Sequence, residues 1–176
     1  MHGPCLPALV IIRPFIVTFQ RKMLAIYLHH DHSVLTNVFC TQALCADSVV
    51  SFLAANFVTF GWDLTLTSNK RRALDMVTKH FGSVAAATVK NTGIENLPMV
   101  VLVYKLRSTM EIFQLIKGSS TLDELMSQLL SAQDTYASQL AVEVREEEER
   151  EARDQKVARS LIFPLKIKIV FSYLEK

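Results

Sequence analysis

Two stretches of this chain are apolar on both faces of an extended strand, and they limit the fold more than any other feature. Residues 22–31 (KMLAIYLHHD) are apolar at successive positions before a polar end, and residues 97–105 (LPMVVLVYK) form a continuous apolar run. Strands of this kind are buried on both sides, as in a sheet that is covered by helices on each face. The sequence therefore predicts an α/β domain.

Two further strands are expected. Residues 56–64 (NFVTFGWDL) are rich in β-branched and aromatic residues, and Gly61 is a candidate for a bulge there. Residues 111–118 (EIFQLIKG) alternate between apolar and polar positions. The short KLRST segment before them predicts a hairpin with the preceding strand.

Helices are expected between these strands. Residues 37–56 carry apolar side chains at helical spacing. Residues 68–82 predict a second helix, in which Ser68 is the candidate N-cap and Gly82 takes the left-handed conformation that ends helices. Each helix follows a strand, which is the pattern of a crossover between parallel strands.

The strongest local signal is the capping box TLDE, which opens with Thr121. In this motif the Thr121 and Glu124 side chains each accept a hydrogen bond from the other residue's backbone N–H. Apolar residues follow on one broad face, and neither glycine nor proline interrupts the run before Pro164. We expect one long helix that becomes a charged linker over 133–160 and gives way to an apolar, strand-like tail at 161–176.

The order of strand, helix, strand, helix, paired strands and helix is that of a thioredoxin-like sheet. Thiol-exchanging proteins of this kind carry Cys-x-x-Cys at a helix start, where the helix dipole favours the thiolate. Here Cys40 and Cys45 are five positions apart, which on a helix leaves them about 140° from facing each other. A thiol oxidoreductase that uses Cys40 and Cys45 is retained as an alternative to two small, partly buried cysteines.

A polar cluster of His29, His30, Asp31 and His32 ends the first strand, and histidine and carboxylate are metal ligands. Because neighbouring residues at a strand end point in opposite directions, at most two of these side chains converge. We expect no metal site, and we expect Asp31 to shape the following loop. The sequence also lacks phosphate-loop, dinucleotide and nucleophile-elbow motifs, so no catalytic residue and no cofactor is expected.

Charge and composition exclude further classes of protein. A net charge of +2 does not support a nucleic-acid binder that rests on bulk positive charge. Three cysteines cannot form a dense disulfide scaffold, and no apolar run reaches the length of about 18 residues that a membrane span needs. The acidic segment 143–154 (EVREEEEREARD) carries a net charge of −4, so the remainder of the chain is basic.

The densest basic cluster is Lys70-Arg71-Arg72, near the start of the second expected helix. Cations at this position are unfavourable for the helix dipole. The cluster is either a solvated face or part of an anion site, for which Lys79 is a further candidate.

The segments LAIYLHHDHSVLTNVFCTQALC, VVSFLAANFVTFGWDLT, SNKRRALDMVTKHFGSV and TLDELMSQLL together resemble the UAS domain of the FAS-associated factors. These are UBX-domain adaptors, and the factor 1 branch resembles this chain more than its sister factor 2 branch. The resemblance extends over about residues 22–156. It implies a thioredoxin-like fold without oxidoreductase activity, which agrees with the absent Cys-x-x-Cys.

The resemblance also implies a function as an interaction module. UAS domains of this family respond to long-chain unsaturated fatty acids by self-association through a basic surface. Lys70, Arg71, Arg72 and Lys79 are the candidate residues for this surface because they form the densest basic face. Whole members of the family bind ubiquitinated proteins and the valosin-containing AAA ATPase through their UBA and UBX domains, and they act in ubiquitin-dependent protein degradation, including that at the endoplasmic reticulum. A purely structural spacer domain is a third interpretation.

The expected organisation is a UAS domain at 22–132 and a charged helix at 133–160, between an atypical N-terminal extension (1–21) and an atypical apolar tail (161–176). Residues 1–20 have the apolar length of a secretion signal, but Arg13-Pro14 splits the run, and no cleavage site follows. We therefore expect an extension, and a location in the cytoplasm or nucleus with association to the endoplasmic reticulum as an option.

Overall fold

The structure is a computed structural model, and it describes residues 22–106 and 109–174, with side chains described for 22–105 and 110–160. It divides into two compact units, of which the first ends at Ala137 and the second begins at Ser138. The expected extension at 1–21 and the turn between the paired strands lie outside the described residues.

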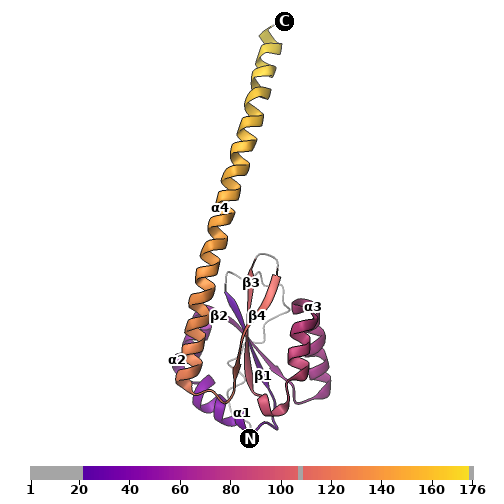
Figure 1. The fold of residues 1–176 in the computed structure, drawn as a ribbon, viewed down its shortest axis with the longest axis vertical. Coiled ribbons are helices and arrows are strands. Elements are labelled where there is room, and N and C mark those ends of the chain that lie inside the picture. The colour runs from indigo at the N-terminus through magenta and orange to yellow at the C-terminus, as the bar shows by residue number, and fades with distance from the viewer. Residues whose placement is uncertain (1–21, 107–108, 175–176) are drawn as a thin grey trace. The chain divides into compact units, whose positions relative to one another are not determined.

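The first unit contains a four-stranded sheet in the order β2-β1-β3-β4 (Figure 1). β1 pairs in parallel with β2 and antiparallel with β3, and β3 and β4 form an antiparallel pair. This is the thioredoxin-like arrangement, so the predicted fold class is confirmed. The strands are β1 (Met23–His29), β2 (Phe57–Asp63), β3 (Met99–Leu106) and β4 (Thr109–Lys117).

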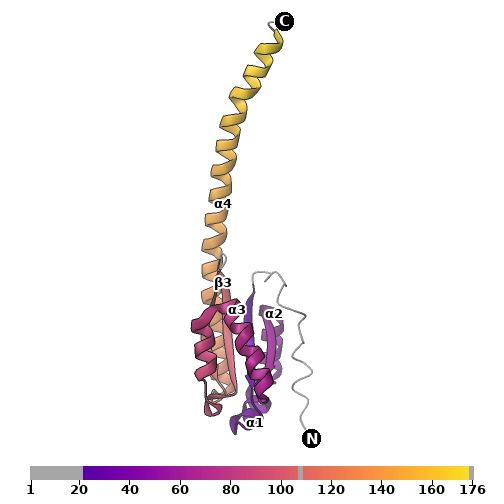
Figure 2. The ribbon, with the colours of Figure 1, turned by 90° about the vertical axis from the view of Figure 1, so that its right-hand side faces the viewer.

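Helices cover both faces of the sheet. Figures 1 and 2 show α3 on one face, and α2 with the start of α4 on the other. Short elements complete the fold: a π-helical turn at Cys40–Leu44 and a 3-10 turn at Ile94–Asn96. The helices are α1 (Leu35–Phe39), α2 (Asp47–Asn56), α3 (Thr67–Asn91) and α4 (Leu122–Leu174).

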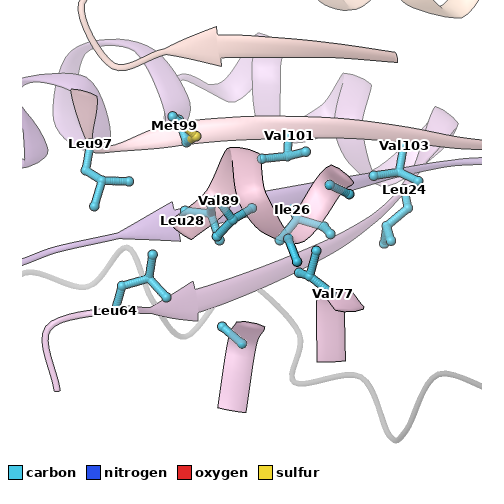
Figure 3. Close-up of a cluster of buried hydrophobic side chains, with 13 residues drawn as sticks. Leu24, Ile26, Leu28, Leu64, Val77, Val89, Leu97, Met99, Val101 and Val103 are labelled. Atoms are coloured by element: carbon cyan, nitrogen blue, oxygen red, sulfur yellow. The ribbon is translucent and has the colours of Figure 1, made fainter. Parts of the chain in front are cut away.

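The two-sided burial of β1 that the sequence predicts is complete, because every residue from Met23 to His29 is buried. Alternate β1 residues Leu24, Ile26 and Leu28 belong to a core cluster that includes Val77 and Val89 of α3 (Figure 3). The intervening residues point to the opposite face, as the period of a strand requires. Since a fully buried aliphatic side chain contributes about 1.5–3 kcal/mol, this central strand anchors both halves of the core.

The helix expected at 37–56 is interrupted, and this expectation is corrected. A π-helical turn follows α1, and Ala46 is extended (φ −62°, ψ 136°) before α2 begins. The helical segments Leu35–Leu44 and Asp47–Asn56 meet at 76°. The change of direction lets both segments bury apolar side chains, with Phe39 on the first and Val49 on the second.

Corrections also apply at α3. The helix begins at Thr67, and its N-cap is Leu66 without a side-chain cap, so Ser68 does not have the predicted role. Gly82 has φ 84° and ψ 174° and ends the first helical piece, near the position predicted. A second piece then continues to Asn91 and buries Ala85, Ala86 and Val89, which the helix prediction for 68–82 omitted.

The strand register places the bulge elsewhere than at Gly61. Gly61 pairs with Tyr27 in an unbroken β1–β2 register. The irregularity lies between Leu102 and Val103, which pair with Gln114 and Ile112 of β4 and leave Phe113 as the extra residue. Phe113 instead contacts Tyr104 with ring centroids 5.8 Å apart.

The capping box at the start of α4 is present. The backbone N of Thr121 donates to Glu124 Oε2 at 2.8 Å, and the backbone N of Glu124 donates to Thr121 Oγ1 at 3.3 Å. In the first unit α4 buries Leu125, Leu129, Ala132 and Tyr136. Hence the predicted helix start and its apolar face both occur.

The strand-like tail expected after residue 160 is not observed, because α4 continues through Pro164 to Leu174. A short apolar run has no periodicity that separates strand from helix, which explains the error. Within the described part of the chain, no single helix combines the length and apolar character of a membrane span. Among the described helices, one bent pair, Leu35–Leu44 with Asp47–Asn56, meets that test of length and composition.

Candidate functional site

The candidate basic residues, chosen as the densest basic face, lie on α3, with three of them in its first turns and Lys79 further along. Arg71 and Arg72 are exposed and Lys70 is half-buried. Lys70 shares the helix side of the buried Ala73 and Val77, whereas successive residues are rotated by about 100°. The three cationic side chains therefore point in different directions around the first turn of the helix.

Lys79 is exposed but lies apart from that first turn. Nine residues separate it from Lys70, which corresponds to roughly 13 Å along a helix. It shares the outer side of α3 with Arg72, seven residues earlier. One small anion cannot contact all four cations, so Lys79 is not part of the cluster that Lys70, Arg71 and Arg72 form at the helix start.

The N-terminus of α3 has no side-chain cap among the residues that the structure describes. Its N-cap, Leu66, has no polar side chain. The first N–H groups of a helix lack intrahelical partners and carry the positive end of the helix dipole. An anion at this position would accept from these N–H groups and also offset the cations of the first turn.

Apolar side chains lie next to this basic turn. Leu66 is 60% exposed. Trp62 Nε1 donates to the backbone O of Asn69 at 3.1 Å, which fixes the indole of edge strand β2 against the start of α3. Phe60 packs beside Trp62 with ring centroids 5.3 Å apart, and both rings are half-buried. Sequence analysis missed this partnership because it depends on the contact between β2 and α3.

The turn after β1 holds two hydroxyl groups that donate hydrogen bonds to the backbone. Ser33 Oγ donates to the backbone O of Leu97, next to the cis peptide between Leu97 and Pro98. Thr36 Oγ1 donates to the backbone O of His30 at 2.9 Å. Ser33 and Thr36 have the spacing of a Cys-x-x-Cys pair without its sulfur chemistry.

Behind this turn, four polar side chains form a continuous chain. The Tyr27 hydroxyl lies 3.0 Å from Cys40 Sγ and 3.0 Å from His29 Nδ1. His29 Nε2 lies 2.9 Å from Asp31 Oδ1. Tyr27 and His29 are buried, Cys40 is half-buried, and the Asp31 side chain is 48% exposed.

This chain of contacts perturbs two titrating groups. A hydrogen bond with Cys40 raises the pKa of His29, burial opposes that rise, and the hydrogen bond with Asp31 adds to it. Burial and the Cys40 contact raise the pKa of Tyr27 far above its ordinary value. His29 is therefore biased toward the imidazolium and Tyr27 toward the neutral phenol.

The cysteine pair that the oxidoreductase alternative requires is not assembled. Cys40 is a thiol, so Cys45 is not its disulfide partner. Cys40 is the first residue of the π-helical turn, and Cys45 follows the last. Tyr27 is a neighbour that sequence analysis did not assign to Cys40. The sequence showed only that Tyr27 lies two residues before His29, and therefore on the same face of the strand.

The histidine cluster does not form a metal centre. His29 turns to Asp31, whereas the rings of His30 and His32 contact each other at 5.4 Å between centroids. Among the side chains that the structure describes, no group of three or more His, Cys, Asp or Glu residues could hold a metal ion. The backbone N of Asp31 donates a hydrogen bond to Thr65 Oγ1 at 3.0 Å.

Comparisons with known proteins identify relatives of this chain. Human FAS-associated factor 1 is 48% identical over 135 residues, which are 77% of this chain and 21% of the human protein. UBX domain-containing protein 3 of Caenorhabditis elegans is 31% identical over 138 residues, 77% of this chain and 22% of that protein. The chain thus spans about a fifth of the length of the curated relatives it matches.

A solution structure of a thioredoxin from Thermus thermophilus also matches, with a TM-score of 0.49 and 18% identity, over 63% of this chain and 73% of that chain. The family model described as Fas-associated factor 1 matches residues 15–131. By this match and the shared identity with its relatives, the chain belongs to the Fas-associated factor 1 family.

Proposed function

We propose that this chain is a non-enzymatic interaction module of a ubiquitin-pathway adaptor. Membership of the Fas-associated factor 1 family supports this role, as does similarity to a protein named for its UBX domain. The lack of a Cys-x-x-Cys pair in the sequence argues against disulfide exchange. In the whole adaptor, ubiquitinated proteins and the valosin-containing AAA ATPase are the proposed partners, bound through other domains.

The proposed ligand of the module is a long-chain unsaturated fatty acid, which promotes self-association. The observation that carries this proposal is the junction of three cations, a helix N-terminus without a side-chain cap, the exposed Leu66 and the half-buried Trp62 at the start of α3. The carboxylate would accept hydrogen bonds from Lys70, Arg71 or Arg72, and the tail would contact Leu66 and Trp62. Lys79, further along α3, would anchor a second head group or a second copy.

The head group and the tail of the fatty acid would contribute different amounts of binding free energy. An exposed ion pair contributes about 0–1 kcal/mol. Each buried methylene of the tail contributes about 0.8 kcal/mol, so covering eight of them outweighs the head group by roughly sixfold. The basic cluster therefore orients the lipid, while the apolar contact supplies most of the affinity.

Charge reversal at the head-group position tests this proposal. The chain is examined by sedimentation velocity with an unsaturated long-chain fatty acid below its micelle-forming concentration, and with a saturated acid as the lipid control. We expect growth in size with the unsaturated acid only, and we expect Arg71→Glu with Arg72→Glu to reduce it. The matched double variant Lys105→Glu with Lys117→Glu changes the net charge equally on β3 and β4 and should respond normally.

An unchanged response of the Arg71/Arg72 variant would reject the proposed head-group site. No response of the unaltered chain, the second outcome, would reject the lipid role itself. The second outcome would favour a structural spacer, a candidate supported by the continuity of α4 from Leu122 to Leu174. The location of the adaptor in the cytoplasm or nucleus is proposed with the same module.

A further inference from the structure

We draw no further inference here: the strongest candidate, the outer edge of β2 on the side of the sheet away from β1, pairs with no other strand among the described residues, and nothing in the structure shows what covers it.

Discussion

His29 has both ring nitrogens in use, at the end of a strand that is otherwise apolar. Nδ1 contacts the Tyr27 hydroxyl, and Nε2 contacts the Asp31 carboxylate. The pKa of His29 is raised, primarily by its hydrogen bond with Cys40, and burial only partly offsets this. A buried histidine usually becomes harder to protonate, so the polar neighbours decide the direction here.

A stability dependence on pH follows from this raised pKa. The ordinary pKa of the group is 6.5, so the contribution of His29 is fully present below pH 6.5 and is lost as pH rises through the higher folded-state pKa. Urea unfolding of the full chain should therefore show a free energy of unfolding that falls over this window. The fall should be smaller in Asp31→Asn, and equal slopes in the two proteins would contradict the assignment to His29.

Gly82 divides α3 into two helical pieces, and its backbone explains why this position requires glycine. Its φ of 84° and ψ of 174° lie in a region that residues with a Cβ rarely occupy. A Cβ built there meets no atom within 4 Å, so any cost arises from the backbone conformation and not from crowding. Gly82→Ala should lower the free energy of unfolding by about 1–3 kcal/mol in urea titrations. The neighbouring exposed Ser83→Ala is the control, and equal midpoints for the two variants would refute this account.

Local signals identified some elements from sequence, whereas tertiary contacts decided others. Two-sided apolarity located β1, and the TLDE motif located the start of α4, because both patterns depend on residues close in the chain. The break at Ala46 follows from burying two segments on one sheet face, which no local pattern records. At the candidate site the cations were evident in sequence. Their partner Trp62 was not, since its contact to Asn69 depends on packing β2 against α3.

The two units of the molecule depend on different sources of stability, although one helix enters both. In the first unit α4 buries Leu125, Leu129, Ala132 and Tyr136. In the second unit all side chains over 145–160 are exposed, and the ion pair between Arg150 and Glu147, at 3.8 Å, joins two exposed groups. A pair of this type adds about 0.2–0.5 kcal/mol to a helix, far less than a buried leucine.

Hydrogen exchange should therefore divide α4 near the boundary between Ala137 and Ser138. Amides over 125–137 open with the core of the first unit, whereas those over 145–160 are held by helix propensity and weak ion pairs. We expect protection in the first stretch to exceed that in the second by about a hundredfold or more, which corresponds to roughly 3 kcal/mol of opening free energy. Leu129→Ala should raise exchange in the first stretch and leave the second unchanged. Uniform protection along α4, or equal effects of this variant on both stretches, would mean that the second unit has a source of stability beyond its own helix.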